Sequence, residues 1–233
     1  MPTTIQRQVL VRLQSHLKHI KRYPIDLEVL ITVSSIHPWL ITTMANPTQY
    51  FNNVELDEIE KHKGNIMSGC KVKFVFDLVQ KSVIKGEKVL VFSHNIPPIN
   101  LLVNSFENLL GWHKGDEVLV LQGDQELSLR EKIMEKFNKD VENKCKLLIA
   151  STSACAEGIS LTAASRVILI DSEWNHSKTR QAIARAFRPG QERPVFVYKL
   201  LASGTWEEAK YRSNEWKAWL SKMISAGRIS FET

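Results

Sequence analysis

The stretch RVILIDSEWNHSKTRQAIARAFRPGQERPVFVYKLL, residues 166–201, decides the fold class. An apolar run ends at Asp171, polar residues follow, and a segment with helical spacing then leads to Pro189-Gly190. Pro-Gly ends a helix, and the run that follows, 194–201, alternates as a strand does. Strand, helix and strand in this order are typical of a parallel sheet that is covered by its crossover helices.

The same alternation recurs toward the N-terminus. Short apolar runs bounded by polar residues predict buried parallel strands, and the periodic segments between them predict helices. The predicted strands are 88–93, 117–123, 146–151, 166–171 and 194–201, and the predicted helices are 97–110, 127–138 and 177–187. The sequence therefore predicts an α/β fold with a parallel sheet flanked by helices. A helical N-terminal segment is expected over 1–65, the sheet-containing lobe over 66–203, and a C-terminal helix within 204–233.

The composition favours an acidic partner. The 233 residues carry a formal net charge of +6, and the pI is near 9.2, which is typical of proteins that bind nucleic acid or nucleotides, although many basic proteins bind neither. No apolar run approaches the ~18 residues of a membrane span. Cys70, Cys145 and Cys155 lack metal-ligand spacing, so we expect reduced thiols in or near the core.

Short hydroxyl side chains close the predicted strand 146–151. Ser151, Thr152 and Ser153 follow its apolar run directly. Two interpretations stay open, because hydroxyls can cap the following turn through local backbone bonds, and hydroxyls with nearby amides can bind phosphate. Gly158, a few residues later, permits close backbone approach or a positive φ.

Three polar residues follow one stripe of the predicted helix 177–187. Gln181, Arg185 and Arg188 are spaced by four and three residues, which places them on one face, and Ser177 is expected to be the N-cap. The side buried against the sheet is expected to hold Ile183, Ala184 and Phe187. One interpretation of the stripe is a solvated basic face. The other is a phosphate site, because guanidinium is planar, always charged and binds phosphate bidentately.

Five motifs in order carry a family resemblance over about residues 66–211. They are KVLVFSHN (88–95), LQGDQELSLREKIMEKFN (121–138), STSACAEGISLTAASRVILIDSEWNHS (151–177), QAIARAFRPGQERPVFVYKLL (181–201) and GTWEEAKY (204–211). Together they resemble the second RecA-like lobe of Swi/Snf-type remodelling ATPases, within helicase superfamily two. ACAEGISL and AIARAFRPGQ resemble the plant CLASSY proteins, remodellers that act in small-RNA-directed DNA methylation. The resemblance implies a RecA-like fold and DNA-dependent ATP hydrolysis by a longer protein.

The resemblance also implies roles for individual residues. Arg188 matches the arginine finger, Arg185 an arginine that bridges phosphates, and Gln181 the glutamine beside them. The loop that approaches the nucleotide is implied to contain Glu157 and Gly158. The residues implied to contact the DNA backbone are Ser151, Thr152, Trp174 and Lys178. ATP is the implied cofactor, with its Mg²⁺ held by the first lobe, and no metal site is expected in this chain.

Some positions depart from the family pattern. Ser153 stands where many relatives carry lysine or arginine, which puts one phosphate contact in doubt. Many relatives have glycine or another small residue near Glu157. His176 replaces a proline after Trp-Asn, and Pro189 replaces an aliphatic residue, which is expected to stiffen the turn.

Other conspicuous side chains are expected to be structural. Arg130 is interpreted as a structural arginine that pairs with an acidic neighbour. His94 and His176 lack a metal-ligand partner at suitable spacing and are interpreted as surface or hydrogen-bonded histidines. The C-terminal tryptophans are interpreted as packing against the lobe, namely Trp206, Trp216 and Trp219.

No G-x-x-x-x-G-K-[ST] phosphate loop occurs in the sequence. The chain is therefore expected to be a fragment of a longer remodeller or a truncated gene product, and to hydrolyse no ATP alone. The implied partners are a first RecA-like lobe, duplex DNA or chromatin, and RNA polymerase IV machinery, with no membrane; the implied location is the nucleus. A second hypothesis stays open, in which the lobe is a non-hydrolysing module that docks DNA or a protein.

Overall fold

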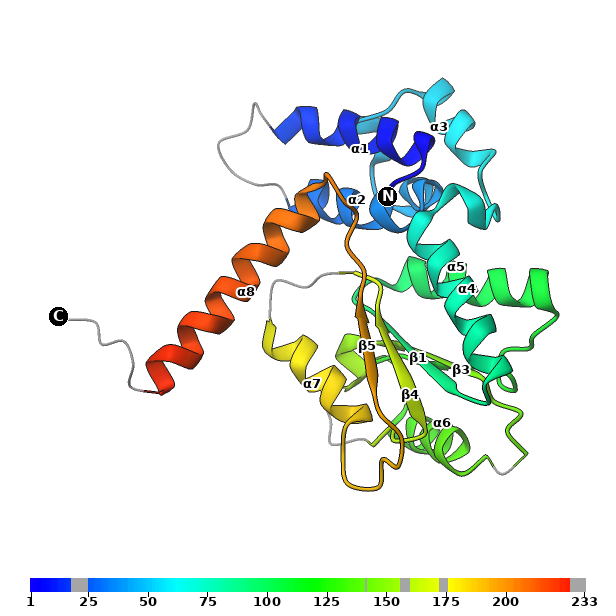
Figure 1. The fold of residues 1–233 in the computed structure, drawn as a ribbon. Helices are drawn as coiled ribbons and strands as arrows, with labels where there is room; N and C mark the ends of the chain where they lie inside the picture. The colour runs from blue at the N-terminus through cyan, green and yellow to red at the C-terminus, as the bar shows by residue number, and fades with distance from the viewer. Residues whose placement is uncertain (18–24, 141, 156–159, 172–175, 227–233) are drawn as a thin grey trace.

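Five parallel strands form the centre of the protein in the computed structural model, which describes residues 1–17, 25–140, 142–155, 160–171 and 176–226 (Figure 1). The strands are β1 (Lys88–Ser93), β2 (Val118–Leu121), β3 (Leu147–Ser151), β4 (Ala164–Leu169) and β5 (Phe196–Lys199). Their order in the sheet is β2-β3-β1-β4-β5, and every neighbouring pair is parallel. The predicted parallel α/β fold is confirmed.

Helices cover both faces of the sheet because successive strand residues point to opposite sides. The helices of the lobe are α4 (Cys70–Ile84), α5 (Ile96–Leu110), α6 (Leu127–Lys139) and α7 (His176–Ala186). Val89 and Val91 of β1 pack in one core with α4 and α5, whereas Leu90 and Phe92 pack in the other core with α6 and α7. Both cores consist of buried aliphatic and aromatic side chains, as the continuous apolar runs predict.

The chain changes direction across the sheet after β3. Strands β2 and β3 lie on one side of β1, and β4 and β5 lie on its other side. The connection from β3 to β4 therefore crosses β1. In the described part of that connection lies only the short 3₁₀ helix η4 (Thr152–Cys155). Ligands of open parallel sheets bind beyond the carboxyl ends of the strands at such a reversal. A binding site is therefore expected at the carboxyl ends of β3, β1 and β4.

The N-terminal segment has a small core of its own and also packs on the sheet-containing lobe. Its helices are α1 (Thr4–Leu17), α2 (Ile25–Ile36) and α3 (Asn53–Glu60). The 3₁₀ helices η1 (Pro38–Thr43) and η2 (Pro47–Gln49) lie between α2 and α3, and η3 (Ile66–Ser68) leads from α3 to the lobe. Asn52 caps α3 in a capping box with Glu55. Leu30 and Ile31 of α2 belong to the small core, while Val33 and Ile36 belong to the core of the sheet, so α2 joins the two.

The last helix, α8 (Trp206–Ser225), starts beside α2 and extends away from the sheet (Figure 1). Trp206 is packed, but against the small N-terminal core and not against the lobe as predicted. The prediction is wrong for Trp216 and Trp219, which are 61% and 44% exposed and stack on each other with ring centroids 4.8 Å apart. They lie on the part of α8 that has left the body of the protein, so no core is within their reach.

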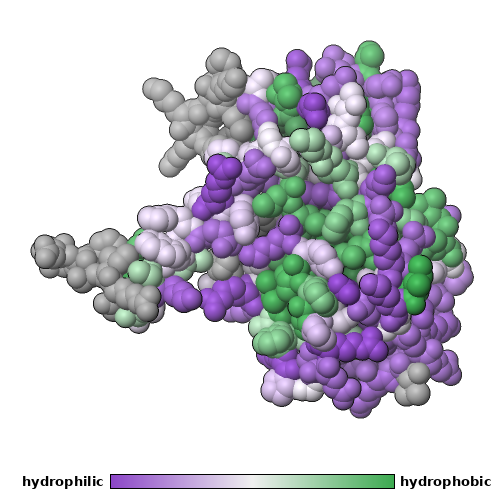
Figure 2. All heavy atoms as spheres, viewed as in Figure 1, coloured by the Kyte–Doolittle hydropathy of each residue, from purple (hydrophilic) through white to green (hydrophobic). Residues whose placement is uncertain are grey.

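The edge strand β5 is less covered than the other strands. Phe196 and Val197 are exposed, and Figure 2 shows apolar side chains gathered over β5.

Two cysteines have free thiols. Cys70 is half-buried, and burial raises the pKa of the Cys145 thiol to about 11. Across the described ranges, every helix is too short or too polar to cross a bilayer.

Candidate functional site at the carboxyl edge of the sheet

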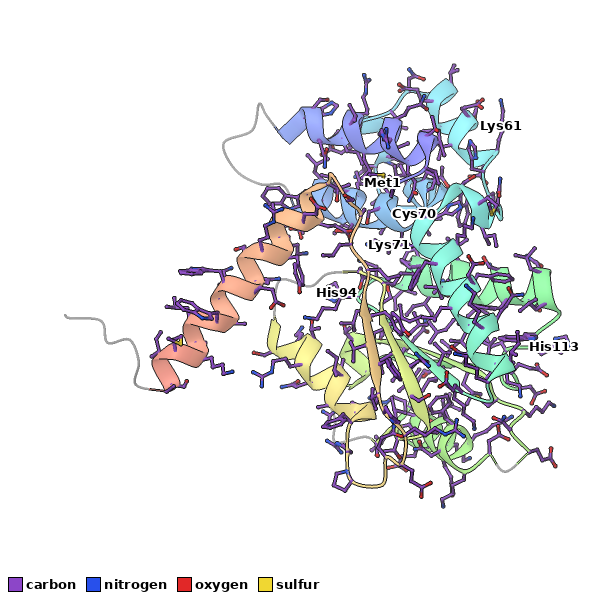
Figure 3. The ribbon with its side chains drawn as sticks, viewed as in Figure 1. Met1, Lys61, Cys70, Lys71, His94 and His113 are labelled. Atoms are coloured by element: carbon purple, nitrogen blue, oxygen red, sulfur yellow. The ribbon has the colours of Figure 1, made fainter. Side chains whose placement is uncertain are left out.

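Polar side chains meet where the three central strands end. Ser93 at the end of β1 is the register partner of Ser151 at the end of β3, and β4 is paired to β1 on the other side. His94 follows β1 directly and is exposed at this edge (Figure 3). Because the strands are parallel, residues that lie far apart in the sequence share one edge.

Asp171 organises this edge. The residue is 8% exposed, and its carboxylate accepts hydrogen bonds from Ser93 Oγ at 2.9 Å and from the His94 backbone N–H at 2.9 Å. The backbone N–H and Nδ2 of Asn95 donate to the same carboxylate, at 3.4 and 3.3 Å. Burial raises the pKa of Asp171, and these hydrogen bonds act in the opposite direction. The carboxylate thus fixes the turn between β1 and α5. Sequence reasoning recognised Asp171 only as the end of a strand.

Ser151 and Thr152 lie beside this turn but differ in their contacts. Ser151 is buried, and its hydroxyl lies 3.0 Å from Ser153 Oγ and accepts from the Ala154 N–H at 3.3 Å. These bonds are the local caps that one of the two interpretations expects. Thr152 Oγ1 lies 3.4 Å from His94 Nδ1, at the limit of a hydrogen bond. Thr152 is itself only 9% exposed, so His94 is the exposed polar group of the edge, with Thr152 and Ser151 beneath it.

Helix α7 buries a different side from the one predicted. The residues that face the sheet are Ala182 and Ala186, with Ile183 half-buried, whereas Ala184 is exposed and Phe187 is 71% exposed. Two alanines four residues apart let the helix lie close to the sheet. Phe187 escapes burial because the helix ends at Ala186. Ser177 lies inside the first turn, since α7 begins at His176, so it is not the N-cap.

The three residues of the predicted stripe have different environments. Gln181 is exposed, Arg185 is 7% exposed, and Arg188 is half-buried in the turn that follows α7. The carbonyl of Arg185 accepts from the Leu161 N–H at 2.8 Å, just before β4 begins. The arginines therefore lie beside the amino end of β4, one helix length from the carboxyl edge.

Gln191 holds the turn that carries Arg188. Its Nε2 donates to the carbonyls of Thr162 and Ala164, each at 2.9 Å, and to that of Ala186 at 3.2 Å. Gly190 has φ 97°, a conformation that glycine adopts without strain. Sequence reasoning assigned Gln191 no role, because its three acceptors lie in other parts of the chain or at the end of α7.

The remaining predicted site residues lie on two helices. Lys178 is exposed in the first turn of α7, near the carboxyl edge, and Arg130 is half-buried on α6. The pairing of Arg130 with an acidic neighbour stays a prediction. Outside the described residues lie Glu157, Gly158 and Trp174. The described site residues thus form two groups. The first, which we call the polar edge, consists of Thr152, His94 and Lys178. The second, which we call the arginine turn, consists of Arg185 and Arg188 at the other end of α7.

A buried ion pair fastens α8 to this edge. Lys71 Nζ donates to Glu207 Oε1 at 2.7 Å and to the carbonyl of Ile170, beside Asp171, at 2.9 Å. Ser35 Oγ donates to the same carboxylate at 2.8 Å, and the Ala202 N–H donates to its other oxygen at 2.8 Å. The Lys71 and Glu207 side chains are 3% and 1% exposed. Figure 3 shows Lys71 between the N-terminal helices and the sheet. We call this cluster the anchor.

The arginine turn has donors that suit a nucleotide phosphate. It holds two guanidinium groups, one at the end of α7 and one in the turn after it. Guanidinium is permanently charged and has the geometry to bind two phosphate oxygens at once. Among the described residues, no group of three or more His, Cys, Asp or Glu side chains is arranged to hold a metal ion.

Comparisons with known proteins agree with this architecture. Residues 70–190 match the helicase conserved C-terminal domain. The chain is 52% identical over 222 residues to the SNF2 domain-containing proteins CLASSY 2 and CLASSY 1 of Arabidopsis thaliana, covering 95% of this chain and 17% and 18% of those proteins. It thus spans less than a fifth of the length of these relatives.

Two solved structures share the fold. The C-terminal part of the Fun30 ATPase domain aligns with a TM-score of 0.69 at 23% identity, over 91% of this chain and 85% of that chain. The Sulfolobus solfataricus SWI2/SNF2 ATPase core in complex with dsDNA aligns with a TM-score of 0.70 at 20% identity, over 98% of this chain and 45% of that chain.

Proposed function

Because this chain belongs to the helicase C-terminal domain family and is the second RecA-like lobe of an SNF2-type protein, we propose that it supplies the arginine half of an ATP site and part of a DNA grip. The single observation that carries the proposal is the arginine turn, where Arg185 and Arg188 are placed by α7 and by the Gln191 clamp. A solvated basic face needs no such clamp.

ATP is the cofactor of the proposed site, and its bound form supplies a γ-phosphoryl group for transfer to water. The roles of this chain's residues follow from their placement. Arg188 would neutralise charge that develops on the phosphoryl oxygens, and Arg185 would orient the phosphates, with Gln181 beside them. The first lobe would complete the site on closure, as conformational closure does in many enzymes. Glu157 and Gly158 remain proposed contacts of the nucleotide.

DNA contacts are proposed at the other end of α7. Thr152 and Lys178 would hold one backbone strand, with Ser151 and Trp174 as further proposed contacts. The Sulfolobus solfataricus SWI2/SNF2 ATPase core, 45% of which aligns with this chain, was solved in complex with dsDNA, and this supports the proposal. A grip of so few contacts predicts weak, sequence-independent binding of duplex DNA that falls with salt.

The similarity to CLASSY 1 and CLASSY 2 supports a proposed setting for the lobe. We place it in a chromatin remodeller that acts in the nucleus, in small-RNA-directed DNA methylation and gene silencing, with RNA polymerase IV machinery as a proposed partner. The coarser assignment, a lobe of an SNF2-type remodeller, does not depend on this setting.

The proposal is tested by replacing Arg188 with lysine in a protein that joins this chain to its first lobe. Lysine keeps the charge but loses the planar fork. Arg188→Lys is expected to lower DNA-stimulated ATP turnover by about a hundredfold or more, while the affinity for ATP changes far less, because the contact matters mainly in the transition state. The measurements are turnover, nucleotide affinity and melting temperature.

Arg193→Lys is the matched control, because Arg193 lies in the same loop, is exposed and donates to the Gly86 carbonyl at 2.9 Å. It is expected to keep full turnover. Unchanged turnover in Arg188→Lys would exclude a catalytic role and favour the alternative, a non-hydrolysing docking module. A fall in melting temperature in step with turnover and affinity would make Arg188 a structural residue.

A further inference from the structure

A groove runs between α7 and the outer half of α8. Its volume is about 1070 Å³. Ser177 and Arg180 of α7 line one wall, and the other wall is the face of α8 that includes Ala218 and Lys222. In Figure 1, α8 starts beside α2 and extends past α7 without lying on the sheet.

The charge of the groove is positive. Among the described residues, three exposed cations line it, namely Arg180, Lys217 and Lys222. The lining carboxylate Glu215 is paired with Lys199, 3.1 Å away, so its charge is balanced within the protein. A groove that concentrates positive charge attracts a polyanion and raises its local concentration.

An aromatic surface stands at the rim of the groove. Trp219 belongs to the lining, and Trp216 stacks on it with an interplanar angle of 25°. Proteins bind single nucleic-acid strands with two elements, cations that contact the backbone and aromatic rings that stack on the bases. The groove has both, because its exposed and stacked indole rings lie beside cations. A duplex offers no free base faces to such rings.

We propose that this groove binds a single nucleic-acid strand. The phosphates lie along Arg180, Lys217 and Lys222, and a base stacks on the free face of Trp219, which Trp216 supports from behind. From Asn214 to Ser225, α8 extends about 16 Å at 1.5 Å per residue, which corresponds to roughly five nucleotides at a stacked spacing of 3.4 Å. The inference stands apart from the proposed function, since it uses neither the arginine turn nor the polar edge.

The test measures the binding of fluorescein-labelled dT15 by anisotropy at several salt concentrations. Trp219→Ala is expected to weaken binding roughly five- to a hundredfold, the range of one base stacked on an aromatic ring. The double variant Arg180→Ala/Lys222→Ala is expected to reduce the slope of log K against log salt by about 1.4, because each phosphate contact with a single strand contributes about 0.7.

The matched control is Lys61→Ala/Lys85→Ala, which removes the same charge. Lys61 follows α3 and is labelled in Figure 3, and Lys85 is the C-cap of α4, a helix that lies away from α8 in Figure 1. The control is expected to leave the salt slope within about 0.3 of the wild type. Equal slopes for the two double variants, or unchanged dT15 affinity in Trp219→Ala, would overturn the proposal and leave the groove to a protein partner.

A 15-base-pair duplex separates this inference from the proposed DNA grip. Trp219→Ala is expected to leave duplex affinity unchanged, whereas Lys178→Ala weakens the duplex more than dT15. If Trp219→Ala weakens both probes equally, the rings belong to a general DNA surface and the single-strand site is wrong. The melting temperature of each variant shows that the loss is not one of folding.

Discussion

The two halves of α8 differ in what surrounds them. Its first turns are buried: Glu207 lies in the anchor, and Lys210 pairs with Glu28 of α2 at 2.7 Å. Its outer half carries Trp216 and Trp219 into solvent. One helix therefore has a half whose contacts are made within the chain and a half whose aromatic surface has no core to join. The difference shows that a helix fixed firmly at one end can hold a binding surface in place at the other.

Breaking the anchor is expected to have the largest effect on stability. Lys71→Met keeps an unbranched side chain, one atom shorter, but leaves the Glu207 carboxylate buried without its ammonium partner. Loss of one partner of a buried pair costs about 3–5 kcal/mol, which lowers the melting temperature by on the order of 10 °C in a chain of this size. Chemical and thermal denaturation measure the change.

Adding Glu207→Gln to Lys71→Met is the control for that explanation. The amide removes the uncompensated charge, so the double variant is expected to be more stable than Lys71→Met alone. If the single variant loses less than about 1 kcal/mol, the buried pair does not hold α8, and the contrast between the two halves of the helix fails.

The stability of the protein is also expected to depend on pH through Asp171. This residue follows Ile170, whose carbonyl belongs to the anchor. Burial raises the pKa of Asp171 in the folded protein. The folded state therefore binds this proton more tightly than the unfolded state. The resulting stability is present below the ordinary pKa of about 3.9 and is lost as the pH rises through the raised value.

Asp171→Asn removes this titration. We expect the stability of the wild type relative to Asp171→Asn to fall as the pH rises from about 4 toward neutrality. Denaturation at a series of pH values measures the difference. A constant difference would show that Asp171 titrates alike in both states, so that its hydrogen bonds offset its burial.

The smallest effect on stability is expected in the outer half of α8. Trp216→Ala removes a stacked but exposed ring, and a ring pair contributes about 0.5–1.5 kcal/mol beyond the area that it buries. We expect a loss of at most about 1 kcal/mol, well below that of Lys71→Met. A loss as large as that of Lys71→Met would mean that the rings are part of the fold after all.

The sheet was predictable because each central strand is a continuous apolar run between helical segments, so both of its faces are buried. The buried side of α7 was not, because the helix ends at Ala186 and the periodicity that would bury Phe187 stops with it. The anchor joins residues 136 positions apart, and local patterns carry no sign of such a pairing. Gln181, Arg185 and Arg188 were found by spacing and resemblance, and their roles stay predictions, as do those of Glu157, Gly158 and Trp174.

The anchor also has a consequence for synthesis on the ribosome. Lys71 is made 136 residues before Glu207, a delay of roughly 7 to 27 s at the usual 5–20 residues per second. The carbonyl of Ile170 also emerges late, so a growing chain holds the ammonium group of Lys71 with neither of its final partners. The N-terminal helices, whose contacts are mostly local, can fold during this interval. The junction between them, β4 and α8 is therefore completed only when the last helix emerges.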